Sequence, residues 1–272
     1  MWAAVRRVRN RVGTGALASV TVWAQAPSPV RASAARLTQQ PPKMAAEPKS
    51  EPLSDESAQP AVRGFLHRPS EPAGPGLVLT HGAGGNCQML LLRALADEFA
   101  SQGWFVLRCD LPFRQARPHG PPSPSSAARD REGLRRALQV LGRFAPGPLH
   151  LGGHSYGGRQ ASMLAAEDPQ VARALLLTSY PLHPPGKPEQ LRVRHFPQLR
   201  IPALFAIGTR DPFATVEELE SARKLIPAAT SVVVVEGAGH DLGYGRKRLG
   251  EDLPARVSES FTALINAGLK FS

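Results

Sequence analysis

Cysteine, aromatic residues and long apolar runs are all scarce in this chain of 272 residues. The two cysteines, Cys87 and Cys109, are too few for a disulfide framework and lack the spacing of metal ligands, so we expect a reducing compartment and no bound metal. Aromatic residues are only 6% of the chain, which leaves few rings on which nucleic-acid bases could stack. The mildly apolar stretch Val12 to Trp23 is too short to span a bilayer. We therefore expect no nucleic-acid partner and no membrane span.

Acidic residues are absent from the first 43 positions, which carry seven cations. These cations supply +7 of the net charge of +11, so the rest of the chain is only mildly basic at +4. Three interpretations of this tail stay open: a weak secretory signal with a small-residue cleavage site, an organelle transit peptide, or an upstream extension with Met44 as the real start. We favour the third and expect a cytoplasmic protein. A genuine targeting segment in residues 1–43 would instead mean an exported or organelle-targeted protein.

Residues 44–60 are mostly Pro, Ser, Glu and Ala, a composition that cannot bury enough apolar surface to fold. We therefore predict an N-terminal extension and linker over residues 1–60 and one domain over residues 61–272. A chain of this size buries roughly 70–75% of its unfolded surface and needs no cofactor for stability. Apolar strand-like runs alternate with amphipathic helical segments, which predicts an α/β fold with a mostly parallel sheet and helices on both faces.

The centre of the pattern is a short apolar run that glycines interrupt, residues 149–159 (LHLGGHSYGGR). Ser155 lies at the interruption, with Gly153 and Gly157 two positions to either side. This Gly-x-Ser-x-Gly pattern is typical of a nucleophile elbow, in which a strand turns into a helix within one or two residues and strains the serine backbone. The turn would lift the Ser155 hydroxyl above the carboxyl edge of the sheet, beside the first amides of the new helix.

An acid and a base follow at the ends of two further predicted strands. Residues 203–208 form a buried run that ends shortly before Asp211, and residues 231–236 lead into the loop that carries His240. A serine hydroxyl needs an imidazole to accept its proton, and the imidazole needs a carboxylate to fix its tautomer. The sequence order Ser155, Asp211, His240 is the order of the α/β hydrolases.

A glycine-rich loop upstream completes a resemblance to a known family. The apolar run 76–80 enters residues 81–86 (HGAGGN), the H-G-x-G type of loop. From about Val62 to Leu269 the chain resembles an α/β hydrolase of the dienelactone-hydrolase-like type, with no large cap domain. The resemblance implies that the backbone N–H groups of Ala83 and Tyr156 form an oxyanion hole.

Two further segments, residues 107–114 and 179–187, are similar to a smaller group within that superfamily. The group includes testis-expressed hydrolase-like proteins and the hydrolase-like domain of a subunit of a histone-acetyltransferase regulatory complex. True dienelactone hydrolases carry a cysteine where this chain has Ser155, so dienelactone is not the expected substrate.

The segment from Pro181 to Pro202 is too short to fold as a cap domain. We therefore expect an open site and a small ester as substrate. Arg114, His183 and Lys187 lie on predicted loops at the carboxyl edge, where they could bind an anionic substrate group. A solvated basic rim is the alternative interpretation of these three residues.

Together these features predict a serine hydrolase that cleaves an ester, lactone or related acyl bond through Ser155, His240 and Asp211, without an organic cofactor. Asp211 is preferred as the acid over Asp241, because the acid and the base of a triad lie on separate loops. Asp110 also follows a predicted strand, and it is the alternative acid at another strand end. Two other functions stay open: a hydrolase-like scaffold or binding protein with little activity, and a peptidase or acyltransferase built on the same residues.

Overall fold

The computed structural model describes residues 49–71, 74–245 and 252–268. The chain divides into two units after residue 43, and the described residues all belong to the second unit, residues 44–272. The predicted N-terminal tail lies outside the described residues, so its three interpretations stay predictions. None of the described helices is long and apolar enough to cross a bilayer.

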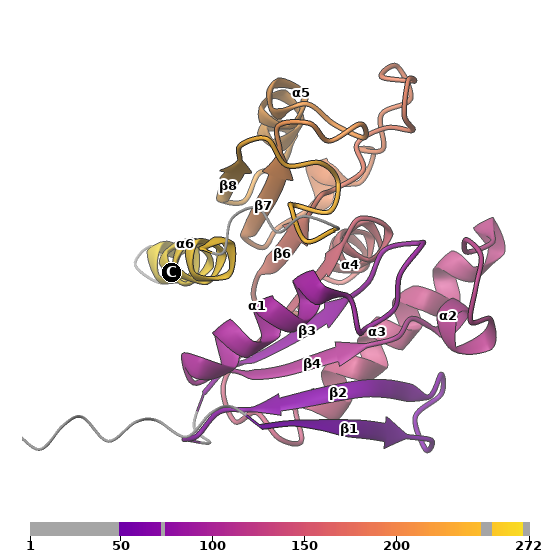
Figure 1. Cartoon of the computed structure of the whole chain (residues 1–272), viewed down its shortest axis with the longest axis vertical. Helices are drawn as coiled ribbons and strands as arrows, with labels where there is room; N and C mark the ends of the chain where they lie inside the picture. The colour runs from indigo at the N-terminus through magenta and orange to yellow at the C-terminus, as the bar shows by residue number, and fades with distance from the viewer. Residues whose placement is uncertain (1–48, 72–73, 246–251, 269–272) are drawn as a thin grey trace, which may run out of the picture. The chain divides into compact units, whose positions relative to one another are not determined.

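Within the described residues, eight strands form one sheet in the order β1-β2-β4-β3-β5-β6-β7-β8 (Figure 1). The strands are β1 (Lys49–Asp55), β2 (Val62–Arg68), β3 (Gly76–Thr80), β4 (Phe105–Cys109), β5 (Leu149–His154), β6 (Leu175–Thr178), β7 (Ala203–Gly208) and β8 (Thr230–Val235). β1 pairs antiparallel with β2, and β2 pairs antiparallel with β4. The other neighbours are all parallel, which confirms the predicted mostly parallel sheet.

Helices cover both faces of the sheet (Figure 1). They are α1 (Leu90–Ser101), α2 (Pro112–Ala116), α3 (Ala127–Leu141), α4 (Tyr156–Glu167), α5 (Val216–Ala222) and α6 (Leu253–Gly268), with short 3₁₀ turns η1 (Pro124–Ser126), η2 (Phe196–Gln198) and η3 (Arg223–Leu225). α1 and α6 share one core, in which the rings of Phe99 and Phe261 lie 5.9 Å apart. α3, α4 and α5 belong to the other core. Successive strand side chains serve opposite cores, as Leu77 and Val78 do, because they alternate across the pleat.

Two helix ends show why these segments form helices. α1 ends where Gly103 takes a φ of 91°, a left-handed conformation that glycine adopts without strain. α5 begins with a capping box between Thr215 and Glu218: the Thr215 hydroxyl accepts the Glu218 N–H at 3.1 Å, and the Glu218 carboxylate accepts the Thr215 N–H at 2.7 Å.

The first strand corrects the expected linker over residues 44–60. β1 pairs along its whole length with β2, so the sheet begins at Lys49 and not near Ala61. The composition of β1 is polar, but a strand at the edge of a sheet gains backbone hydrogen bonds that do not depend on side-chain polarity. Leu53 is its only half-buried hydrophobic side chain, and Asp55 accepts the N–H groups of Ser57 and Ala58 in the following turn.

The carboxyl ends of the parallel strands gather the loops that matter for function. β3, β5, β7 and β8 all lead to this edge of the sheet, and each is followed by one of the chemically important loops of the sequence. The segment between β6 and β7, residues 179–202, contains only the turn η2 and no cap domain. The edge is therefore reached without a folded lid.

Candidate active site

The turn from β5 into α4 holds Ser155 in a backbone conformation that few residues adopt. Its φ is 52° and its ψ is −118°, and α4 begins at the next residue. A Cβ at Gly153 would lie 2.8 Å from the Gly157 carbonyl carbon, and one at Gly157 would overlap the His81 carbonyl oxygen. Only glycine fits at these neighbours, which is the physical reason for the Gly-x-Ser-x-Gly pattern. The elbow therefore fixes where the Ser155 hydroxyl lies.

A chain of hydrogen bonds joins Ser155, His240 and Asp211. His240 Nε2 lies 2.8 Å from Ser155 Oγ, and His240 Nδ1 lies 2.9 Å from both carboxylate oxygens of Asp211. The carboxylate accepts the Nδ1–H, so the Nε2 lone pair faces the serine hydroxyl. The Asp211 side chain is fully buried, whereas the His240 side chain is 24% exposed. This geometry allows the serine proton to move to the imidazole.

Two further rings hold the imidazole of His240. The Phe213 ring lies 4.2 Å from it at an interplanar angle of 36°, and the His154 ring lies 5.1 Å from it. The backbone of Phe213 also binds Asp211, because the Phe213 N–H donates to Asp211 Oδ1 at 2.9 Å. Burial lowers the pKa of His154 to about 3, so His154 is neutral and adds no charge beside His240.

The two residues predicted to form an oxyanion hole, Ala83 and Tyr156, line the cavity that contains Ser155. Tyr156 is the first residue of α4, so its N–H has no acceptor within the helix. Ala83 lies on the glycine-rich loop after β3, and both residues line the same cavity as Ser155. The Ala83 carbonyl accepts a hydrogen bond of 2.8 Å from Arg114, which fixes the peptide planes of this loop.

A cavity of about 600 Å³ opens above Ser155. Its walls come from the glycine-rich loop, the Pro-rich segment before α3, α4, the segment after β6 and the loop after β7. The residues that line it are Ala83, Pro121, Pro122, Ser123, Pro124, Ala127, Ser155, Tyr156, Arg159, Gln160, Met163, Pro181, Arg192 and Phe213. The volume suits a small organic ligand.

The sequence model of a family described as alpha/beta hydrolase domain matches residues 74–267. The chain belongs to the α/β-hydrolase family. The fold of this hydrolase is shared with a putative dienelactone hydrolase from Klebsiella pneumoniae, with a TM-score of 0.64 at 19% identity over 80% of this chain and 98% of that one. A dienelactone hydrolase from Anabaena variabilis gives 0.62 at 19% identity, covering 80% and 99%. Est1E from Butyrivibrio proteoclasticus gives 0.61 at 16% identity, covering 80% and 99%.

Three cationic residues expected at the substrate lie elsewhere in this hydrolase. Arg114 is buried, and its guanidinium donates to backbone carbonyls of the glycine-rich loop and of the Pro-rich segment. His183 Nε2 contacts Glu218 at 3.1 Å, and Lys187 is exposed. None of the three is among the residues that line the cavity beside Ser155, so a role for them in substrate binding stays a prediction. Their positions on loops at the carboxyl edge suggested that they bind an anionic substrate group, but the sequence does not show in which direction a side chain points.

Arg159 and Arg192 line the cavity of this hydrolase, although the sequence analysis did not single them out. One sequence signal could have identified Arg159. It lies four residues after Ser155 on the predicted helix, so the two side chains share a helix face. Arg192 reaches the cavity from the segment after β6, for which the sequence offers no periodic pattern.

The rejected acids and the cysteines have structural roles. Asp110 accepts the Cys87 N–H at 2.7 Å, and Asp241 accepts the Gly243 N–H at 2.9 Å. Burial raises the pKa of both thiols, that of Cys87 to about 12, so neither is a thiolate at neutral pH. No group of three or more His, Cys, Asp or Glu side chains suited to a metal occurs in residues 49–71, 74–245 and 252–268.

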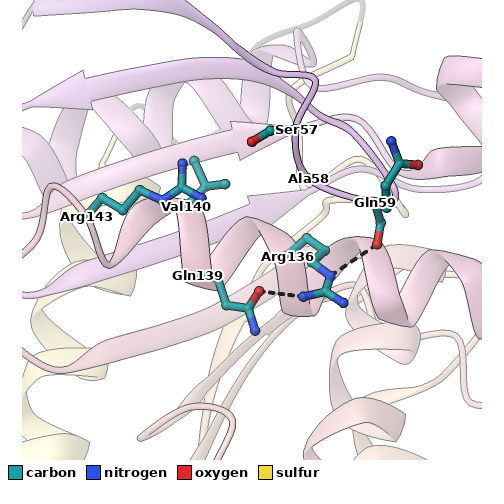
Figure 2. A pocket seen from close by; sticks show the side chains of 7 residues that line it. All are labelled: Ser57, Ala58, Gln59, Arg136, Gln139, Val140 and Arg143. Atoms are coloured by element: carbon teal, nitrogen blue, oxygen red, sulfur yellow. Dashed lines mark hydrogen bonds between the residues drawn. The ribbon is translucent and has the colours of Figure 1, made fainter.

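A second, smaller hollow of about 270 Å³ lies between the turn after β1 and α3 (Figure 2). Its lining also includes two arginines, Arg136 and Arg143. Figure 2 shows the Arg136 guanidinium bonded to the Gln59 carbonyl oxygen at 3.1 Å and to the Gln139 side chain at 2.9 Å. Arg143 pairs with Asp55 at 2.5 Å. Both cations in this hollow of the hydrolase therefore have partners.

Proposed function

We propose that this hydrolase is a serine hydrolase that cleaves an ester, lactone or related acyl bond through an acyl-enzyme intermediate. The observation that carries the proposal is the chain of hydrogen bonds from Asp211 through His240 to Ser155, which ends in the 600 Å³ cavity. Each member lies after a different strand, so the sheet holds the three side chains in place. Membership of the α/β-hydrolase family supports the same chemistry.

The first half of the reaction forms the acyl enzyme. Ser155 Oγ attacks the carbonyl carbon while its proton moves to His240 Nε2, and the carbonyl π bond becomes an oxyanion. Asp211 holds the Nδ1–H and stabilises the imidazolium. The carbon–oxygen bond to the leaving alcohol then breaks, and His240 gives the proton to that oxygen.

The second half releases the acid. A water molecule donates its proton to His240 as its oxygen attacks the acyl carbon. The oxyanion then collapses, the bond between the acyl carbon and Ser155 Oγ breaks, and His240 returns the proton to Ser155 Oγ. In both halves the N–H groups of Ala83 and Tyr156 would stabilise the oxyanion. One such donor is typically worth ~10²–10³ in turnover. The absence of a cap over residues 179–202 favours a small ester.

Labelling with a fluorophosphonate probe tests the proposal. The probe reacts with a serine that a base and an oxyanion hole have activated. We expect wild-type protein to be labelled at Ser155, and Ser155→Ala and His240→Ala to stay unlabelled at pH 7.5. Ser162→Ala is the matched control, because Ser162 also lies on α4 beside a histidine but away from the cavity lining.

The outcome that contradicts the proposal is a folded wild-type protein that stays unlabelled while a serine esterase in the same tube reacts. Circular dichroism of each variant establishes that it is folded. Labelling that survives in Ser155→Ala would place the reactive serine elsewhere and would equally reject the assignment.

A further inference from the structure

Two positively charged side chains enter the cavity beside Ser155. Arg159 lies one helical turn after Ser155, and its N–H donates to the Ser155 carbonyl at 3.0 Å. Residues four apart on a helix have Cβ atoms about 5–6 Å apart, so the Arg159 side chain starts next to the nucleophile. Arg192 approaches from the segment between β6 and β7, and both residues are half-buried.

Among the described residues, no carboxylate compensates the positive charge of these two side chains. None of the residues that line the cavity is Asp or Glu, and Arg159 Nε is buried without a hydrogen-bond partner. Burial lowers the pKa of Arg192, and the positive charge of Arg159 lowers it further, so the two guanidinium groups repel each other. Neither forms an ion pair within the described part of the chain, where the ion pairs involve other arginines or histidines.

The arginines in the hollow beside α3 differ from Arg159 and Arg192, because they have acidic or carbonyl partners. Arg143 pairs there with Asp55, and Arg136 pairs with Glu132 at 2.8 Å. Arg136 also donates to the Gln59 carbonyl oxygen (Figure 2). Holding two unpaired like charges in a partly buried cavity costs stability, because desolvation and repulsion both oppose it. An anion bound between the two groups would offset that cost.

We propose that the substrate carries a carboxylate that binds between Arg159 and Arg192 while its ester or lactone carbonyl lies at Ser155. This inference rests on the proposed function and names its substrate class. A guanidinium group presents parallel N–H donors that match the two oxygens of a carboxylate. Met163 and Phe213 line the space alongside, where a short carbon chain would pack. The substrate is then a small anionic ester, such as a half ester of a short dicarboxylic acid.

The test compares esters that differ in charge but not in shape. Monoethyl glutarate carries a carboxylate, and ethyl glutaramate replaces it with a neutral amide of the same size. A second pair, 4-acetoxybutyrate and 4-acetoxybutyramide, puts the charge in the alcohol part. We expect wild-type kcat/KM, measured by NMR, to favour the charged member of at least one pair by ten-fold or more.

The preference for charge should depend on the two arginines. Arg159→Gln and Arg192→Gln should each reduce it by about ten-fold while hydrolysis of the neutral ester continues. Arg194→Gln is the matched control, because it removes one positive charge from an exposed position of the same segment and should leave the preference unchanged. The KM of the charged ester should also rise with added NaCl.

Three outcomes would overturn the inference without touching the proposed function. Wild-type protein could hydrolyse both members of each pair equally, or the preference could persist in both arginine variants. Inorganic phosphate could also inhibit hydrolysis of the neutral ester more strongly than glutarate does, which would reject a carboxylate as the bound group. Failure of the proposed function looks different: no ester is hydrolysed, and the fluorophosphonate probe does not label Ser155.

Discussion

Two serine–histidine pairs lie close together in this protein, and by distance they are equal. Ser155 Oγ lies 2.8 Å from His240 Nε2, and Ser162 Oγ lies 2.8 Å from His195 Nε2. Both serines are connected with α4, one as its N-cap and one within it. The difference between the pairs is in what surrounds them.

The pair of Ser162 and His195 is arranged so that no proton can leave the serine for the ring. The fully buried Ser162 hydroxyl donates to the Arg159 carbonyl at 2.9 Å, so it accepts from the imidazole. Burial lowers the pKa of His195 to about 4, and the charges of Arg159 and Arg131 lower it further. The pair of Ser155 and His240 has Asp211 behind the ring. The comparison teaches that the direction of the hydrogen bond and the third group distinguish the two pairs, not the distance.

Removing each serine gives the largest expected contrast. Ser155→Ala should lower kcat on a small ester by about 10⁴–10⁶, as loss of the nucleophile does in a serine hydrolase. Ser162→Ala should leave kcat within about two-fold. The measurement is steady-state hydrolysis with both variants at equal concentration. If kcat fell equally in the two variants, the proposed difference between the two pairs would be wrong.

Asp211→Asn should make the first pair behave more like the second. Asn replaces one carboxylate oxygen with an NH₂ donor, and a donor facing Nδ1 selects the tautomer that carries its proton on Nε2. Nε2 then cannot accept the Ser155 proton, and kcat should fall by about 10⁴. Asp241→Asn is the control, because Asp241 is next to His240 in sequence but bonds to Gly243. If Asp241→Asn costs as much as Asp211→Asn, the assignment of the acid is wrong.

The positions of Ser155, Asp211 and His240 could be predicted because strand ends are readable in the sequence. The apolar run 203–208 and the run 231–236 each end at a polar loop, and parallel strands bring such loops to one edge. The glycines around Ser155 also indicated a tight turn, and the structure shows which atoms a Cβ at each of them would meet.

The direction of long side chains could not be predicted. Arg114 and Arg159 both belong to segments that face the site, but Arg114 turns back to bind carbonyl groups while Arg159 enters the cavity. β1 escaped prediction for a different reason, since Lys49–Asp55 has a linker-like composition and is held by backbone hydrogen bonds to β2. Such pairing leaves no mark in the residue types.

The hydrogen bonds from Arg114 to the glycine-rich loop, here called the Arg114 clamp, give a third and smaller difference between the two serine–histidine pairs. Only the pair of Ser155 faces the glycine-rich loop, whose Ala83 and Gly85 carbonyls Arg114 binds at 2.8 Å each. Arg114→Gln should loosen this loop and lower kcat by about ten- to a hundred-fold, below the loss of a whole oxyanion donor, with KM little changed. Added guanidinium ion should restore part of the kcat. An unchanged kcat would show that the loop keeps its position without the clamp.

The smallest expected effect concerns stability and comes from the second pair. The folded pKa of His195 is about 4, below the usual value of 6.5, so the unfolded chain binds more protons between these values. The contribution of His195 to stability is therefore complete above pH 6.5 and is lost as the pH falls from about 6.5 to about 4. His195→Gln should make the free energy of unfolding fall less steeply over this window. The difference is at most about 1.4 kcal/mol per pH unit and is reduced by partial solvent exposure.

Urea denaturation at pH 7.5, 6 and 5 measures this slope. His154 also has a lowered pKa, of about 3, and it remains in the variant, so the slope should be reduced and not abolished. Hydrolysis at pH 7.5 should be unchanged in His195→Gln, because His195 does not line the cavity. A slope equal to that of the wild type would mean that His195 becomes protonated in the folded protein as readily as in the unfolded chain. The assignment of a neutral, half-buried imidazole to His195, which distinguishes this pair from the pair of Ser155 and His240, would then be wrong.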